Sequence, residues 1–196
     1  DYLYYIHNLV FEESNSIDDL ELQVGRFIGN DLSTLVFNSK LDGIKLEIGS
    51  RNLSFGAQAF YSGLLLNKTS PILMSLLDEI KAMEDEDNFG SKRFIYSAYA
   101  LVEEFALRQN LGLEFVGQND LNDRNQEFID SYYLSLSLNG PIVPALQYNF
   151  LTLYELANTS DGLEQYLVFD GKLQLVVPSV KGSFALTGTY SIPFQD

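Results

Sequence analysis

Few residues of this chain combine the types and the spacing that chemistry at a site requires. Cysteine is absent and His7 is the only histidine, so no Cys-based or His-rich metal centre is expected. We interpret His7 as a strand residue near an interface and not as the base of a Ser-His-Asp triad. The carboxylates and amides between Asn119 and Glu127 could offer oxygens to Ca²⁺, but their spacing differs from an EF-hand loop and favours a solvated loop. The sequence contains no Walker loop or GxSxG elbow. It therefore predicts no catalytic residue, no metal ligand and no cofactor, and we do not expect an enzyme.

Charge and length set further limits on function. The 196 residues include 12 Lys and Arg against 27 Asp and Glu, for a formal net charge of -15. Nucleic-acid binding needs a basic surface, and docking on anionic lipid needs a polybasic patch. The acidic composition therefore predicts neither function. No run of about 18 apolar residues is present, so the sequence predicts no transmembrane helix. The chain begins at Asp1 without a signal peptide, and we expect a mature or trimmed segment.

The strongest pattern is a strict alternation between residues 42 and 66. Ile44, Leu46 and Ile48 alternate with polar or glycine neighbours, and the alternation resumes after a polar turn at residues 49–52. Because successive side chains of a strand point to opposite faces, this stretch predicts a β-hairpin with one apolar and one polar face. Long alternating strands with short turns are typical of a transmembrane β-barrel, whose strands need about 9–11 residues to span the bilayer.

The same alternation recurs along most of the chain. It predicts further strands at residues 1–13, 19–29, 93–102, 111–118, 132–139, 146–154, 166–177 and 182–192. The fold class expected is therefore all-β, an antiparallel transmembrane β-barrel of about ten strands, with the possibility of more in the full chain. Residues 1–196 are expected to form a single barrel domain. Short connections after residues 49, 107, 139 and 178 alternate with longer ones after residues 28, 66, 120 and 157.

Three local features refine this prediction. Asn139-Gly140-Pro141 is typical of a tight turn. Asp170-Gly171 is typical of a hairpin turn as well, but the alternation continues through it, so we expect one continuous strand there. Glu103-Glu104 would place one carboxylate toward lipid, so we expect this pair near the membrane boundary.

One amphipathic helix is expected inside a long loop, at residues 68–90. Ser70 is a suitable N-cap, Pro71 suits the first helical position, and apolar residues follow at helical spacing from Ile72 to Met83. The acidic run at residues 84–87 ends the helix. Its apolar stripe must be buried. We expect it to pack at the rim or in the lumen, and the alternatives are the membrane surface or a protein partner.

The polar faces of the expected strands supply the candidate pore-lining residues. They are mostly hydrogen-bonding side chains of mixed charge: Lys45, Glu47, Gln58, Tyr99, Glu114, Gln118, Tyr133, Asn149, Lys172 and Gln174. Every second residue of a barrel strand faces the lumen, so these side chains would contact water while the apolar positions contact lipid.

Two stretches resemble a group of largely uncharacterised spirochaete (treponemal-type) outer-membrane β-barrel proteins. The first runs V-G-R-F-I-G-N-D-L-S-T-L-V-F-N-S-K-L-D-G-I-K-L-E-I-G over Val24–Gly49, and A-L-V-E-E-F-A-L-R-Q-N-L-G-L-E-F-V-G-Q-N-D-L over residues 100–121 is similar. The resemblance covers about two-thirds of the chain at the level of pattern. It implies a bacterial outer-membrane location and a porin-like role, without catalytic residues. Pro193–Asp196 lacks the terminal aromatic residue of such barrels, so we expect the true C-terminus elsewhere.

Three hypotheses for function follow. The first is a porin-like passive channel, with outer-membrane lipid and small solutes as partners. The second is a non-conducting barrel that presents loops, above all residues 68–90, to a protein partner or host ligand. The third is a soluble lipocalin-like carrier with its apolar faces turned inward. Single-channel conductance separates the first from the second, and solubility without detergent identifies the third.

Overall fold

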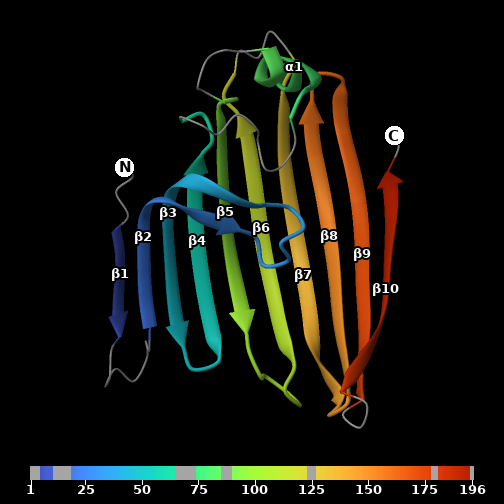
Figure 1. The fold of residues 1–196 in the computed structure, drawn as a ribbon. Helices are drawn as coiled ribbons and strands as arrows, with labels where there is room; N and C mark the ends of the chain where they lie inside the picture. The colour runs from blue at the N-terminus through green and yellow to red at the C-terminus, as the bar shows by residue number, and fades with distance from the viewer. Residues whose placement is uncertain are drawn as a thin grey trace.

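A single antiparallel sheet dominates the structure, a computed structural model that describes residues 5–10, 19–64, 74–84, 90–122, 127–177 and 181–194. The described residues form ten strands and one helix, and each strand pairs with its neighbours in chain order (Figure 1). The elements are β1 (Tyr5–Val10), β2 (Asp19–Asn30), β3 (Asn38–Ser50), β4 (Leu53–Tyr61), α1 (Leu76–Glu84), β5 (Arg93–Val102), β6 (Asn110–Asp120), β7 (Ile129–Val143), β8 (Leu146–Thr159), β9 (Gly162–Val177) and β10 (Gly182–Phe194). The all-β, antiparallel prediction is confirmed.

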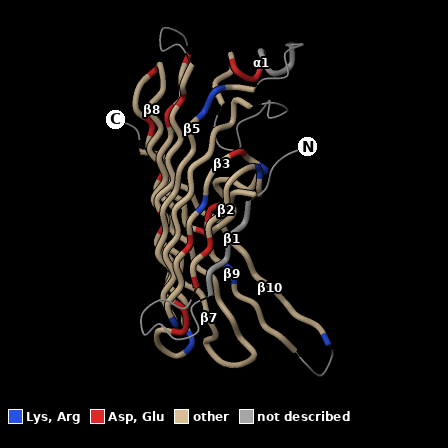
Figure 2. The backbone as a smooth tube through the Cα atoms, turned by 90° about the vertical axis from the view of Figure 1, so that its left-hand side faces the viewer, with Lys and Arg blue, Asp and Glu red and all other residues tan. Residues whose placement is uncertain are grey.

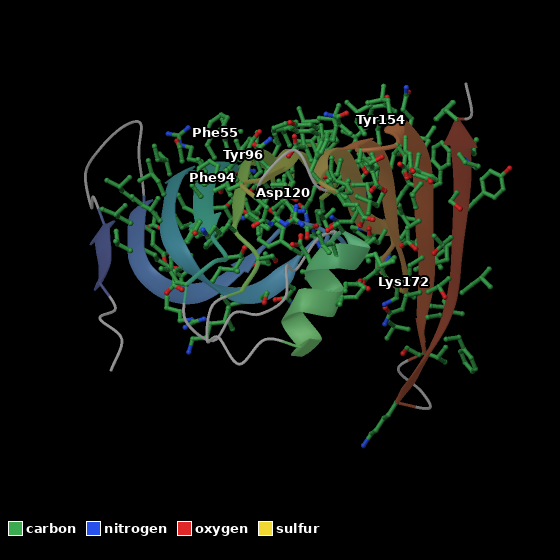
Figure 3. The ribbon with its side chains drawn as sticks, turned by 90° about the horizontal axis from the view of Figure 1, so that it is seen from above. Phe55, Phe94, Tyr96, Asp120, Tyr154 and Lys172 are labelled. Atoms are coloured by element: carbon green, nitrogen blue, oxygen red, sulfur yellow. The ribbon has the colours of Figure 1, made fainter. Side chains whose placement is uncertain are left out.

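The sheet is curved but not closed. Seen along the strands it forms an arc, with α1 at the mouth of its concave side (Figure 3). β1 and β10 are its two edges, and no pairing joins them among the described residues. We call the end of the strands near α1 the helix end, and the opposite end, with the β3–β4 turn, the turn end (Figure 1).

Several connections between strands differ from prediction. β7 continues through Asn139-Gly140-Pro141, where a turn was predicted, and the chain reverses at Pro144-Ala145 instead. The strand register shifts between Pro141 and Val143, which accommodates the proline within the strand. A proline near a strand end removes only one backbone hydrogen-bond donor from the sheet. The longer loop predicted after residue 157 is also wrong, because β8 runs to Thr159 and joins β9 through a two-residue turn. β9 is continuous through Asp170-Gly171, as predicted.

Helix α1 is confirmed, but its described start and its buried side differ from prediction. Ser70, Pro71 and Ile72 lie outside the described residues. Within the described residues the helix begins at Leu76, after Ser75, whose hydroxyl accepts a hydrogen bond from the Asp78 amide at 3.2 Å. Leu76 and Ile80 of the expected apolar stripe are exposed, whereas Asp78 is buried. The helix is therefore held at the rim by a polar contact.

The two faces of the sheet have opposite character. On the convex face, side chains such as Ile44, Phe55 and Leu134 are exposed although they are apolar. The side chains that alternate with them, such as Lys45 and Gln58, project to the concave face. The predicted orientation of the central hairpin, with its apolar side turned outward, agrees with this arrangement.

The concave face is crossed by the far end of the β2–β3 hairpin (Figure 1). We call residues 26–42 the hairpin tip. The hairpin bends where Gly25 and Gly43 are cross-strand partners. Gly25 has a φ of 119°, and a Cβ on Gly43 would lie 2.1 Å from the Ala59 carbonyl oxygen, so both positions need glycine. The long connection predicted after residue 28 is shorter than expected, because β2 extends to residue 30 and β3 begins at residue 38.

The core lies between the hairpin tip and the sheet. Two aromatic rings of the tip pack against Phe60, with centroid distances of 5.2 Å for Phe27 and 6.1 Å for Phe37. The whole buried cluster consists of Phe27, Val36, Phe37 and Leu41 from the tip and Phe60, Ile95, Val116, Tyr133 and Leu153 from β4 to β8. The segment that fills the concave side is therefore the hairpin tip.

Candidate functional site

The ten candidate pore-lining residues all lie on the concave side of the sheet. The strand register collects several of them into cross-strand rows. Lys45 pairs with Gln58 across β3 and β4, Tyr99 pairs with Glu114 across β5 and β6, and Asn149 pairs with Lys172 across β8 and β9. The sequence alternation, which had grouped these ten residues together, agrees with their placement on one face of the sheet. It did not indicate that the hairpin tip separates them into different environments.

Four of the candidates lie under the hairpin tip. They are buried, and they contact the tip or its neighbours instead of open space: Gln58, Glu114, Gln118 and Tyr133. The Gln58 side-chain amide donates to the Asn30 carbonyl at 2.6 Å and to the Ser97 hydroxyl at 2.9 Å. The Leu32 amide donates to Glu114 Oε2 at 2.6 Å. These polar contacts fix the tip on the inner face of β4 to β6.

The hairpin tip is also organised internally. Asp31 is almost fully buried, and its Oδ1 accepts hydrogen bonds from the amides of Val36 at 3.1 Å and Phe37 at 2.8 Å. Its other carboxylate oxygen accepts from the Ser33 amide at 3.0 Å. One buried carboxylate therefore satisfies three backbone donors of the turn, which gives the tip a defined shape as it crosses the concave face.

A second polar cluster joins α1 to the sheet at the helix end. The guanidinium of Arg93 is fully buried and forms an ion pair with Asp78 of α1. Its Nη1 lies 2.6 Å from Asp120 Oδ2 and donates to the Ile129 carbonyl at 3.0 Å. Asn122 donates to Asp78 Oδ1 at 3.2 Å. Sequence reasoning missed this cluster. The Ser75 to Asp78 capping pattern was the only local signal, and nothing in the sequence indicated that Arg93 faces α1.

The candidates nearest the turn end, Asn149, Lys172 and Gln174, line open space together with residues that were not predicted. Asn110, Asn139, Asn149 and Lys172 are consecutive cross-strand partners on β6, β7, β8 and β9. With Gln174 they line a cavity of about 420 Å³. Asn110 Nδ2 donates to Asn139 Oδ1 at 3.1 Å. Within the described part of the chain, the Asn149, Lys172 and Gln174 side chains make no hydrogen bond or ion pair, so they are available to a solute.

Lys45, Glu47 and Tyr99 form a third group, on the concave side of β3 to β5. Lys45 Nζ lies 2.9 Å from Glu47 Oε2, and the Tyr99 hydroxyl donates to the other oxygen of the same carboxylate. The charges of Lys45 and Glu47 are therefore paired with each other. This partly exposed ion pair contributes little net charge to the concave face.

The oxygen-rich loop at residues 119–127 does not form a cation site in the part that is described. Its residues 123–126 lie outside the described part of the chain. Asp120 contacts Arg93, and the Asn119 side-chain amide donates to the Tyr132 hydroxyl at 2.9 Å. Across the described residues no group of three or more His, Asp or Glu side chains is placed to hold a metal ion. The side chain of His7 is outside the described set.

Comparisons with known proteins add no assignment. No family model, no curated protein and no solved structure matches this chain. Among the described residues no helix is long and apolar enough to cross a membrane. The concave face of the sheet holds an open, polar cavity at the turn end and is covered by the hairpin tip in the middle.

Proposed function

We propose that the protein forms the wall of an outer-membrane β-barrel that acts as a narrow channel for small polar solutes. The observation that carries the proposal is a row of side chains across the convex face. Cross-strand pairing from β2 to β10 places in this row Leu22, Leu46, Ala57, Ala98, Phe115, Leu134, Tyr154, Leu167 and Ile192. None of these side chains is charged.

Such a surface is costly in water and favourable in lipid. Apolar patches beyond a few hundred Å² are rare on soluble monomers, and each apolar Å² left in water costs about 25 cal/mol. Phe55 is 49% exposed, and Leu186 on β10 is 74% exposed. β10 carries no charged residue between Gly182 and Phe194, and its backbone is tan along that whole length in Figure 2. An apolar band on β2 to β10, which are 9 to 16 residues long, suits a bilayer core.

The concave side supplies the polar interior that a channel needs. Figure 3 shows Phe55, Tyr96 and Tyr154 on the convex side, and Asp120 and Lys172 on the concave side. Open sheet edges do not occur in hydrocarbon, because unpaired backbone groups there find no water. The proposal therefore requires β1 and β10 to pair in the membrane, with each other or with further strands of the same barrel.

The hairpin tip makes the channel narrow. It packs across β4 to β8 at mid-height, so a solute that enters from the turn end meets the tip before it reaches the helix end. We propose that the tip sets the conductance, and that the route past it runs along the less covered inner side of β9 and β10. Glu155 and Tyr166, cross-strand partners on the concave face, would line that route.

The test is conductance in planar bilayers, together with a variant that lacks the tip loop. The protein, refolded in detergent, should insert and give small discrete current steps in KCl. Replacement of residues 31–37 by a short glycine linker should remove the constriction and enlarge the step. Replacement of the exposed β3–β4 turn residue Arg51 by glycine serves as the control, since it leaves the tip in place. A folded, inserted protein without current in either form would contradict the channel.

The buried tip also favours a second candidate, a closed barrel that does not conduct. Its apolar side chains fill the middle of the concave side, as a permanent plug would. Absence of current in both the intact protein and the tip-loop variant, with insertion verified, would support this candidate. The lipocalin-like alternative needs apolar residues inside and a polar surface, which is the reverse of the exposure of Phe55 and Leu186. If the protein stays monomeric in the absence of detergent, the lipocalin-like alternative would be favoured again.

A further inference from the structure

The turn-end cavity has a composition unlike that of the chain as a whole. The protein carries a net charge of -15. Yet the described residues that line the cavity include Arg108 and Lys172 and no Asp or Glu. Its volume of about 420 Å³ falls within the range of small-molecule sites. A cavity with two cations and no carboxylate in its lining favours an anionic group over a cation.

The remaining lining is dominated by side-chain amides. Asn110, Asn139, Gln147, Asn149 and Gln174 reach the cavity from four neighbouring strands. An amide offers both donors and an acceptor without charge, which matches the hydroxyl groups of a polar solute. Because Asn110 donates to Asn139 Oδ1, the Asn139 amide is held in place and its NH₂ group stays available as a donor.

The wall of the cavity is held together by hydrogen bonds that involve its own lining residues Tyr148 and Pro141. The Tyr148 hydroxyl donates to Gln109 Oε1 at 2.5 Å, and the Gln109 amide donates to the Pro141 carbonyl at 2.9 Å. These bonds tie the β5–β6 connection, which carries Arg108, to β7 and β8. The cation is therefore held next to the amide row without an added carboxylate, a preorganised arrangement that lowers the ordering cost of binding.

We propose that this cavity binds a small hydroxylated organic anion, with Lys172 and Arg108 at the anionic group and Asn149 and Gln174 at the hydroxyls. The inference rests on the proposed channel function, because it names the class of solute that the channel would admit at its turn end. A carboxylate and a phosphate share the required chemistry. Sugar acids and sugar phosphates are therefore both suitable probes.

The experiment is calorimetric titration of gluconate, and separately of glucose 6-phosphate, into the folded protein. A polyoxyethylene detergent is used because its head group contains no sugar. Lys172→Gln should weaken binding roughly tenfold, as expected for loss of a charge-assisted hydrogen bond. Lys181→Gln is the matched control, because this exposed lysine lies in the β9–β10 turn outside the cavity lining and removes the same charge. Equal losses in the two variants would overturn the proposal, since they would indicate attraction by net charge alone.

Two further titrations test the two halves of the ligand. Neutral glucose and inorganic phosphate should each bind at least about tenfold more weakly than the better of the two probes. If either binds as tightly, the proposal is overturned. Conductance keeps this result separate from the channel itself. Current in KCl without binding of either probe overturns this inference alone. If a probe binds in a Lys172-dependent way but the protein gives no current, the binding site is supported and only the channel function is contradicted.

Discussion

The hairpin tip and helix α1 both cover part of the concave side, but they are held there by opposite chemistry. The tip buries Phe37 and Leu41 against the sheet. The helix leaves Leu76 and Ile80 exposed and buries Asp78, which pairs with Arg93. An apolar stripe at helical spacing therefore does not by itself predict which side of a helix is buried. The side chains of the sheet that the helix meets determine this, and here they include the charged Arg93.

The energetic consequences of the two attachments differ. Burial of a Phe or Leu side chain contributes about 1.5–3 kcal/mol, so the apolar residues of the tip stabilise its position strongly. A buried ion pair recovers little more than its desolvation cost, but it becomes very unfavourable when one partner is removed. We therefore expect the tip to respond to lost volume and α1 to respond to lost charge.

The largest effect is expected from Arg93→Met. It leaves Asp78 and Asp120 buried without their cation, which should lower the free energy of unfolding by about 3–5 kcal/mol. The measurement is a urea titration of the detergent-bound protein followed by circular dichroism. Lys92→Met is the control, because Lys92 is exposed and adjacent in sequence. A similar loss in both variants would remove the distinction between the buried cluster and ordinary surface charge.

Phe37→Ala is expected to have the next largest effect. It truncates a side chain that is only 2% exposed and contacts Phe60, so stability should fall by about 3 kcal/mol. The loosened tip should also raise the current step in bilayers. Leu35→Ala, at an exposed position of the same loop, should change stability by less than about 0.5 kcal/mol. Equal responses at the two positions would mean that the tip is not inserted as described.

Gly43→Ala tests the bend that lets the hairpin tip cross the sheet. The new Cβ would lie 2.1 Å from the Ala59 carbonyl oxygen, which is backbone and cannot give way easily, so a loss of about 2 kcal/mol is expected. Gly49→Ala in the same strand is the matched control, since its Cβ would meet nothing closer than 3.6 Å. If the two variants unfold at the same urea concentration, the close approach at Gly43 does not determine the bend.

The smallest effect is expected at the start of α1. Ser75→Ala removes the hydroxyl that accepts from the Asp78 amide, which should cost about 1 kcal/mol. Ser75→Asp keeps an acceptor at the same place and should restore most of the loss. The same urea titration measures both variants. No difference between Ala and Asp at this position would show that the cap does not stabilise the helix.

Alternation along the chain predicted most of the sheet because strand geometry is local. The period of two identified the concave side for Lys45, Gln58 and Lys172, and it correctly favoured one strand through Asp170-Gly171. The local turn signal, by contrast, failed at Asn139-Gly140-Pro141, because these turn-forming residues remain in β7. There the cross-strand pairing of Asn139 with Asn149 outweighs local turn preference.

The hairpin tip could not be predicted in this way, because its position depends on distant residues. Gly25 and Gly43 are eighteen positions apart in sequence (43 minus 25) and become partners only through the β2–β3 register. The Leu32 amide meets Glu114, a carboxylate on another strand, and no spacing rule connects the two. The same holds for Arg93 and Asp78, whose contact requires α1 to fold back over the rim. Alternation gives the face of each side chain but not what covers that face.

The position of the hairpin tip also has a consequence for the order of folding. Every strand pairs with its sequence neighbours, so each two-stranded unit can form as soon as its residues are available. The tip is different, because its apolar side chains share a core with Leu153 of β8, far later in the chain. The tip can begin to pack on Phe60 of β4 early, but its core is completed only by a much later segment. Complete burial of Phe27, Phe37 and Leu41 therefore reports that the wall has been assembled as far as β8.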